Sequence, residues 1–396
     1  MDVVAAKRDF KFPYGLTLTA REYPQYPMAS ICINILDSGC YAETVFQQHH
    51  LIEHVIYMTM KQQVEDAFDM SMNAQTGLQT VQYMCRLPAV KLASFCQLFL
   101  DSVLNPASFS SSLIEREKQA IKNELGKARN PFDDLLPLMG WARPSEENWP
   151  AFEALSPSEL IRTCSLHYRS PKIHIEVAGL LTGTVYEELL NTLNSMDYLL
   201  RSAQQNTNSG LPLAIAEPVV VVNSNQTLVG YFCEVDTPGR HAYLTMACAH
   251  HLFHAHHDAG LYHKLRFEHG YIYGLTRAYH LFQGRGQYAL FAQVRPEHAV
   301  KVSEEFQQFF SSDGEPLLTG CLPWAAGKCF SSQMLAMESL GEVTKRASQY
   351  YANFGQVMQD GEFYNYLETN KHSQLRQDIQ KSYFNKDIRI IQDDRG

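Results

Sequence analysis

The chain has 396 residues, a length that predicts two or three domains at about 100–200 residues each. Hydrophobic residues make up 45% and charged residues 19%, a composition that excludes a disordered chain. Lys and Arg number 33 against 42 Asp and Glu, and this net charge of −9 argues against nucleic-acid partners, which require a basic face.

Three features bear on the compartment. No run of about 18 apolar residues occurs, so we predict neither a membrane span nor a membrane partner. The opening sequence MDVVAAKRDFKFPYG lacks the apolar core and cleavage site of a signal peptide. The nine cysteines stand singly without a C-x-x-C pair, as expected for buried thiols in a reducing compartment. We therefore expect a cytoplasmic protein.

The first half of the chain alternates stretches typical of strands and of helices. β-Branched, alternating residues favour strands, and apolar residues at a 3.6-residue period favour helices. In chain order, we predict strands within Gly15–Gly39, a helix at Glu43–Met60, a strand at Thr80–Pro88, helical residues that break near Asn105–Pro106, a helix from Ser110 to Ala128, a helix at Ser156–Tyr168 and a strand at Ile173–Gly179. Ser156 and Glu159 fit a capping box at the start of the last helix.

The second half repeats this order of elements. In chain order, we predict a strand at Val219–Val235, one long helix at Ala242–Phe267, strands at Tyr271–Arg277 and Gln287–Val294, helices from His298 onward and a final helix followed by a strand. The repetition suggests that the two halves are related modules.

A polar stretch containing Pro and Gly, residues 201–217, lies close to the midpoint of the chain and is typical of a linker. We therefore predict an α+β fold of two related modules, each an antiparallel-type sheet packed with helices. Residues 1–200 would form the first module, 201–217 the linker and 218–396 the second module.

The segment HHLIEH contains H-x-x-E-H at His50, Glu53 and His54. Residues four apart on a helix share a face, so both imidazoles can bind one Zn²⁺. Glu53 can then reach a water molecule beside the metal without being a ligand, which is the order of the inverzincin motif. The same spacing also occurs on ordinary solvated helices, so a third ligand is needed to support the zinc interpretation.

Two glutamates further along the chain are candidates for that ligand. Glu117 and Glu124 are seven residues apart in a predicted helix and therefore share one face. One could bind the metal while the other orients the site. Their neighbours are mostly charged, so an ordinary surface helix explains the pattern equally well when it is taken alone.

Further segments, in the same order along the chain, resemble the pitrilysin, insulysin and mitochondrial-processing-peptidase family of zinc proteases, peptidase family M16. They are Gly39 with Glu43 before the motif, Tyr57 after it, Asn73–Thr76 followed by Thr80–Tyr83, Glu117–Arg129, His167–Gly179, and Leu261–Gly274 with Arg266, Gly270 and Tyr273. Together they cover nearly the whole chain. The chain departs from the family before the first histidine, where Gln47–Gln48–His49 replaces the usual Gly-Leu-x.

The resemblance implies a role for each matching residue. His50, His54 and Glu124 would be the metal ligands. Glu53 would be the catalytic general base, with Glu117 as a supporting carboxylate. Arg266 and Tyr273 would bind substrate and hold or polarise the scissile peptide from the second module. Asn73 and Ala74 would lie near an edge strand that pairs with an extended peptide substrate.

The second half also carries a dense histidine cluster: His250, His251, His254, His256, His257 and His263. His250 and His254 have ligand spacing, but no Glu stands at the inner position that the motif requires. We interpret the cluster as a degenerate copy of the motif helix, and adventitious metal binding is the alternative.

The resemblance implies a zinc metalloendopeptidase that acts on peptides or unfolded segments. Because the family encloses its site with four such modules and this chain has two, we expect a homodimer, or a heterodimer with a metal-free paralogue. The alternatives are an inactive scaffold subunit and a protein that binds a peptide precursor without cutting it.

Overall fold

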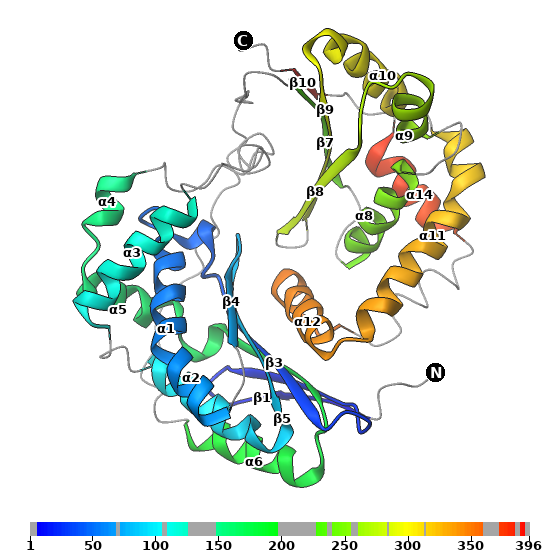
Figure 1. Ribbon diagram of the computed structural model, residues 1–396. Coiled ribbons are helices and arrows are strands. Elements are labelled where there is room, and N and C mark those ends of the chain that lie inside the picture. The colour runs from blue at the N-terminus through cyan, green and yellow to red at the C-terminus, as the bar shows by residue number, and fades with distance from the viewer. Residues whose placement is uncertain are drawn as a thin grey trace. The chain divides into compact units, whose positions relative to one another are not determined.

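The computed structural model describes residues 6–68, 72–104, 109–125, 148–196, 227–235, 240–254, 260–282, 285–312, 314–358, 372–384 and 389–392. The fold is α+β, and the chain divides into two compact units (Figure 1). Unit 1 comprises Met1–Arg129, Arg143–Pro212 and Met337–Met358, and unit 2 comprises Asn130–Ala142, Leu213–Ala336 and Gln359–Gly396.

Unit 1 is built on a six-stranded sheet in the order β1-β2-β6-β3-β5-β4. The strands are β1 (Ala6–Lys11), β2 (Thr17–Glu22), β3 (Met28–Leu36), β4 (Met72–Thr76), β5 (Thr80–Pro88) and β6 (Ile173–Gly179). The pairing of β2 with β6 is parallel, and every other described pairing in this sheet is antiparallel. β4 forms one edge of the described sheet.

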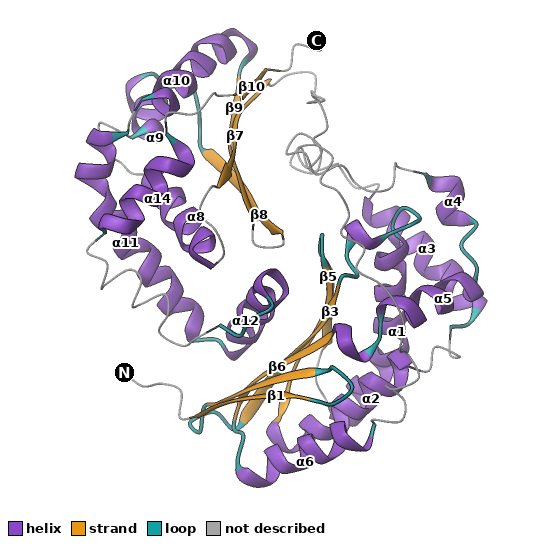
Figure 2. Ribbon diagram, turned by 180° about the vertical axis from the view of Figure 1, so that it is seen from behind, coloured by secondary structure: helices purple, strands orange, loops and turns teal. Residues whose placement is uncertain are grey.

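Helices cover both faces of this sheet (Figure 2). They are α1 (Gln48–Phe68), α2 (Leu92–Leu104), α3 (Ser111–Leu125), α4 (Trp149–Glu153), α5 (Pro157–His167), α6 (Gly183–Ser195) and α12 (Leu340–Phe354). Alternate residues Ile31, Ile33 and Ile35 of β3 join the large apolar core beneath α1, α2 and α6. Burial of these side chains stabilises the unit by about 25 cal/mol for each Å² of apolar surface.

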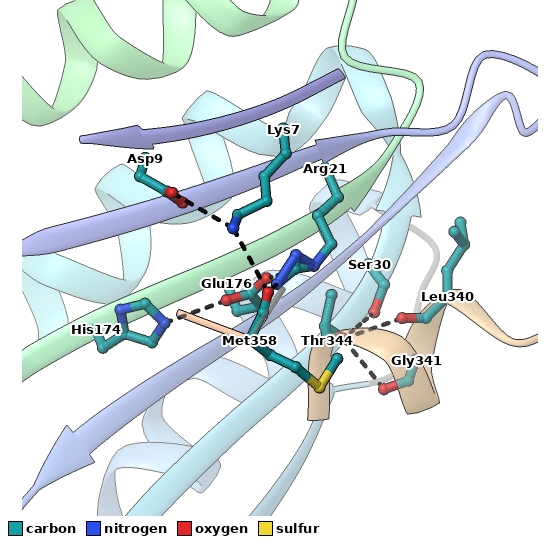
Figure 3. A network of polar contacts seen from close by, with 10 residues as sticks. All are labelled: Lys7, Asp9, Arg21, Ser30, His174, Glu176, Leu340, Gly341, Thr344 and Met358. Atoms are coloured by element: carbon teal, nitrogen blue, oxygen red, sulfur yellow. Dashed lines mark hydrogen bonds and ion pairs between the residues drawn. The ribbon is translucent and has the colours of Figure 1, made fainter. Parts of the chain in front are cut away.

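The opposite face of the sheet is polar and lies beneath α12. Ser30 Oγ lies 3.0 Å from Thr344 Oγ1, and Asn34 Nδ2 donates to Ser348 O at 3.0 Å. A fully buried ion pair joins Arg21 Nε to Glu176 Oε1 at 3.1 Å, and Arg21 also donates to Met358 O (Figure 3). The polar residues on this face of the sheet are typical of a surface exposed to water. Here α12 covers them and bonds to them.

Unit 2 contains a four-stranded sheet in the order β10-β7-β9-β8, with antiparallel pairings. Its strands are β7 (Thr227–Val235), β8 (Leu275–Phe282), β9 (Arg285–Val294) and β10 (Arg389–Gln392). Its helices are α8 (Arg240–Phe253), the short α9 (Leu261–His263), a π-helical turn at Lys264–Glu268, α10 (Ala299–Ser311), α11 (Glu315–Met337) and α14 (Ser373–Tyr383). Aromatic rings fill much of the core, as where Tyr231 stacks on Phe310 at 3.6 Å.

Several predicted elements agree closely with the structure. Thr80–Pro88 and Ile173–Gly179 are strands with the predicted bounds, and Ser156 caps α5 in a capping box. The single helix predicted over Ala242–Phe267 is wrong, because α8 ends at Phe253 and the extended backbone of Gly260 precedes α9.

Among the described residues, the predicted modules and the two units differ at Met337–Met358. The sequence assigned all of 218–396 to the second module, whereas Met337–Met358 groups with unit 1. The predicted linker, 201–217, lies outside the described residues. No helix within the described part of the chain combines the length and apolar character needed to cross a bilayer.

Candidate metal centre

The start of α1 is fixed by a carboxylate. Glu43 accepts hydrogen bonds from the backbone N–H groups of Gln47 and His49, both at 3.1 Å. These N–H groups lie at the N-terminal end of α1, where no intrahelical acceptor exists, and a negative charge at this end also favours the helix dipole. Glu43 thereby sets where the motif helix begins.

The loop before α1 is held against the β4–β5 turn. Ser38 N donates to Gln79 O and Cys40 N donates to Gly77 O, both at 3.0 Å. A Cβ atom on Gly39 would lie 2.4 Å from Gly77 O, so only glycine permits this approach. The result is that α1 packs beside edge strand β4.

The three predicted metal ligands come together. His50 Nε2 lies 3.9 Å and His54 Nε2 3.6 Å from the same atom, Glu124 Oε2. One ligand atom from each residue lies within 4.8 Å of the others. Within the described ranges, this is the one group of three or more His, Cys, Asp or Glu side chains with such spacing. The two histidines come from one face of α1, and Glu124 comes from the last turn of α3.

The other ring nitrogen of each histidine faces an oxygen acceptor. His50 Nδ1 lies 2.7 Å from Gln47 Oε1, and His54 Nδ1 lies 3.2 Å from Glu117 Oε2. A proton on Nδ1 leaves the Nε2 lone pair available for a metal, and such outer contacts orient metal-binding histidines. Glu117, which is buried, therefore lies where a supporting carboxylate was predicted.

The donor set fits zinc. Two imidazoles and one carboxylate are a typical catalytic zinc set, which leaves a fourth position open. Burial, followed by the neighbouring His54, lowers the pKa of His50 to about 4, so this imidazole is neutral near pH 7. A neutral imidazole is the form that binds metal.

Glu53 is buried and lies on α1, the helix that carries His50 and His54. Thr76 Oγ1, on β4, donates a hydrogen bond to Glu53 Oε2 at 2.9 Å. Burial raises the pKa of Glu53, while the hydrogen bond from Thr76 opposes this effect. A carboxylate with a raised pKa is better matched to proton transfer near neutral pH.

The predicted substrate-binding residues of unit 1 lie on β4. Asn73 is exposed and Ala74 is half-buried, and both pair with β5 on one side of the strand. Because β4 is an edge of the described sheet, its other side presents backbone groups that could pair with an extended peptide.

Arg266 and Tyr273 lie together in unit 2. The guanidinium carbon of Arg266 is 4.9 Å from the centre of the Tyr273 ring, and Arg266 Nη1 donates to Ile272 O at 2.9 Å. Tyr273 is 85% exposed, so its phenol is accessible to a ligand. Their contribution to a site that also contains the unit 1 residues stays a prediction.

The second histidine cluster is partly committed to backbone contacts. His254 Nδ1 and Nε2 lie 2.9 Å from His250 O and from Leu275 O, respectively. His256 and His257 lie outside the described residues. The interpretation of this cluster as a degenerate copy of the motif stays a prediction.

Two contacts were not anticipated from the sequence. The contact of Thr76 with Glu53 can be predicted only if the strand that lies beside α1 is known. The role of Gln47 depends on a backbone turn with φ of 60° directly before the helix. For Gln47 the available signal was its position three residues before His50, next to the motif.

Comparison with known proteins finds similarity to M16 peptidases. Residues 155–312 match the family model described as the peptidase M16 inactive domain. Over 219 residues, the chain is 23% identical to a probable mitochondrial-processing peptidase subunit beta of Schizosaccharomyces pombe. This match covers 50% of the chain and 46% of that protein, so the chain matches about half the length of this relative.

Solved structures share the fold over nearly the whole chain. An M16-like peptidase from Alicyclobacillus acidocaldarius has a TM-score of 0.73 at 14% identity, covering 98% of this chain and 97% of that one. A peptidase M16 inactive domain from Pseudomonas fluorescens has a TM-score of 0.73 at 13% identity, with the same coverage. A chain of complex III2 from Candida albicans has a TM-score of 0.74 at 11% identity, covering 97% of this chain and 95% of that one.

The described residues form an α+β protein in which an H-x-x-E-H helix brings His50 and His54 close to Glu124. The chain is similar to M16 peptidases in the sequence of residues 155–312 and in its fold. The stretch matched to the inactive domain begins at residue 155, after Glu124, so that description does not concern the three ligand residues.

Proposed function

We propose that the chain is a zinc-dependent endopeptidase that hydrolyses peptide bonds in peptides or unfolded segments, such as a peptide precursor. The observation that carries the proposal is the convergence of His50, His54 and Glu124, together with the buried carboxylate of Glu53 on the helix that carries both histidines. The relationship to M16 peptidases supports the same class of reaction.

The protein's own side chains have distinct tasks in this proposal. Zinc, when bound, supplies Lewis acidity that polarises the scissile carbonyl and makes water more acidic. Glu53 accepts a proton from the attacking water and returns it to the leaving amine. Glu117 keeps His54 oriented through Nδ1, and Thr76 holds the carboxylate of Glu53.

Substrate binding is proposed to use both units. An extended peptide would pair with the β4 edge near Asn73 and Ala74. Arg266 and Tyr273 would hold the peptide backbone or stabilise negative charge on the carbonyl oxygen. We propose that they act on the site of a second chain, in a homodimer or in a heterodimer with a metal-free paralogue. One relative named as a subunit and one neighbour within complex III are consistent with assembly.

The direct test measures zinc content and peptide cleavage together. The proposal expects about one zinc per site in the purified chain and new peptide ends detectable by mass spectrometry. Glu53→Gln should keep the metal and lose cleavage, whereas Glu124→Gln should lose both. A chain that holds no zinc after incubation with the metal, and cleaves nothing, overturns the proposal. A cytoplasmic location is a separate proposal, to be tested by cell fractionation.

Sharing of sites between chains has its own test. Glu53→Gln chains mixed with Arg266→Ala chains should regain up to about one quarter of the parental activity, because random exchange makes half of the dimers mixed and each has one intact site. Two variants that stay inactive after verified subunit exchange would contradict shared sites while leaving the zinc assignment intact.

A catalytically inactive subunit is the second candidate function. It is favoured by the match of residues 155–312 to a domain described as inactive and by the inactive-domain structure from Pseudomonas fluorescens. This candidate expects neither zinc nor cleavage but stable association with a partner chain. A peptide escort would bind peptide equally well before and after Glu53→Gln, without cutting it.

A further inference from the structure

Gln47 occupies an unusual backbone conformation immediately before α1. Its φ of 60° lies in the left-handed region, where glycine is favoured and other residues are strained. Asp37 and His372 are the other non-glycine residues with positive φ within the described ranges. Gln47 is also 7% exposed, so neither backbone freedom nor solvation explains a long polar side chain at this position.

The backbone of Gln47 is held on both sides. Its N–H donates to Glu43 Oε2 at 3.1 Å, and its carbonyl accepts from Leu51 N at 2.9 Å. These contacts fix the direction in which the side chain leaves the backbone. They would persist if glycine stood here, because both involve main-chain atoms of residue 47.

The side chain of Gln47 makes a short contact with a predicted metal ligand. Gln47 Oε1 lies 2.7 Å from His50 Nδ1. An amide oxygen can only accept, so the imidazole must carry its proton on Nδ1 in this contact. A neutral imidazole then has its lone pair on Nε2, the atom that faces Glu124 Oε2.

The same arrangement exists at the second histidine. Glu117 Oε2 lies 3.2 Å from His54 Nδ1, and Nε2 of that ring also faces Glu124 Oε2. His54 is therefore oriented by the carboxylate of Glu117 from α3. His50 is oriented by the side-chain amide of Gln47, the residue directly before α1. The two contacts select the same tautomer in both rings.

We propose that Gln47 is a positioning residue for metal binding: its side-chain oxygen accepts the Nδ1 proton of His50 and directs Nε2 of that ring toward the metal position. Residue 47 precedes His50 by three positions, and its side chain extends forward along the chain to the ring of His50. This inference rests on the proposed function in one respect, namely that His50, His54 and Glu124 hold a metal.

The first experiment separates positioning from simple packing. Gln47→Gly removes the acceptor and relieves the backbone strain, so the variant should bind zinc about tenfold or more weakly in competition with a chelating dye. The melting temperature of its metal-free form should rise by about 2 °C. Gln47→Glu keeps an acceptor of the same length and should bind zinc at least as tightly as the parent.

A matched control is Asp37→Gly. Asp37 has φ of 52°, and its carboxylate forms an exposed ion pair with Lys172, so the substitution also places glycine at a left-handed position. It touches no predicted metal ligand, and zinc affinity should stay within about twofold of the parent. Equal zinc affinity in the parent and in Gln47→Gly would overturn the proposal. A loss of zinc affinity in Asp37→Gly as large as that in Gln47→Gly would also overturn it.

A second readout needs no metal. With ¹⁵N-labelled histidine, the two-bond couplings of the His50 ring, assigned by comparison with His50→Gln, should show Nδ1–H in the parent and chiefly Nε2–H in Gln47→Gly. Nε2–H in the parent overturns the proposal. Nδ1–H in a parent that binds no zinc would support the orienting contact while refuting the proposed function.

Discussion

Thr76 Oγ1 donates a hydrogen bond to Glu53 Oε2 across 2.9 Å and so joins the edge strand β4 to the motif helix α1. The strand that would pair with an extended substrate is therefore the strand that holds the proposed base. Movement of β4 on substrate binding would be transmitted to Glu53 through Thr76.

Thr76→Val tests this connection. The substitution keeps the size of the side chain and removes the hydroxyl donor to the carboxylate, while the backbone N–H of Thr76 remains. Hydrogen bonds to charged groups contribute about 1.5–3 kcal/mol, so we expect kcat/KM for peptide cleavage to fall about tenfold or more. The zinc content should be unchanged. Thr59→Val is the matched control, because the hydroxyl of Thr59 donates to the carbonyl of Val55 within α1, and this variant should keep its activity.

Glu117→Gln should weaken zinc binding. A neutral amide accepts the Nδ1 proton of His54 less strongly than a carboxylate does, so the ligand basicity of the ring falls. We expect the zinc Kd to rise about tenfold, measured by competition with a chelator. Glu115→Gln on the same helix removes an exposed carboxylate that pairs with Lys118, and an equal effect there would count against a specific role for Glu117.

Gly39→Ala should destabilise unit 1. The new methyl group would lie 2.4 Å from Gly77 O and 2.5 Å from Gln79 N, so the loop or the β4–β5 turn must move. We expect a loss of about 2 kcal/mol in the free energy of unfolding, together with lower zinc affinity because α1 shifts. Gly327→Ala within α11 meets no atom within 4 Å and should be neutral or stabilising, as measured by urea denaturation.

Arg21 and Glu176 form an ion pair whose side chains are 0% and 1% exposed. Arg21→Met leaves the buried carboxylate of Glu176 without the Arg21 guanidinium. We expect the free energy of unfolding to fall by about 3 kcal/mol. Adding Glu176→Gln removes that charge and should recover part of the loss. Arg8→Met, in the more exposed pair with Glu22 on neighbouring strands, should cost less than about 1 kcal/mol. Similar losses in the two single variants would contradict this account.

The stability of unit 2 should fall in acid through His250. Burial, followed by Arg277, His254 and His251, lowers the pKa of His250 from 6.5 to about 2. The unfolded chain therefore takes up a proton first as the pH falls below about 6.5, and stability is lost from that point downward. His250→Gln should make the loss between pH 8 and pH 5 smaller, by at most about 1.4 kcal/mol per pH unit. If the free energy of unfolding of His250→Gln depends on pH as that of the parent does, His250 is not the group responsible.

Local signals in the sequence predicted much of the first unit. The alternation in Thr80–Pro88 and Ile173–Gly179 predicted strands, and the spacing of His50 and His54 predicted one shared helix face. The convergence of Glu124 on these histidines needed the family resemblance, since an exposed glutamate on a charged helix carries no sign of its partner 70 residues earlier.

Contacts between distant segments were harder to predict. Ser30, Asn34 and Glu176 alternate with apolar residues on their strands, a pattern that normally indicates a face exposed to water. Here α12 covers that face through Thr344 and Ser348, whose positions more than 300 residues later give no local signal. Likewise, the left-handed turn at Gln47 could not be inferred from a residue type that seldom adopts it.

The assignment of Met337–Met358 to unit 1 has a consequence for how the protein can be dissected. A single cut near the midpoint would give an N-terminal fragment without α12, in which Arg21 and Glu176 lose the cover of Met358 and face solvent. Such a fragment could retain the motif helix yet unfold readily. A fragment that contains all of the described unit 1 would have to join 337–358 to the first half through an artificial connection, because unit 1 is contiguous in space but not in the sequence.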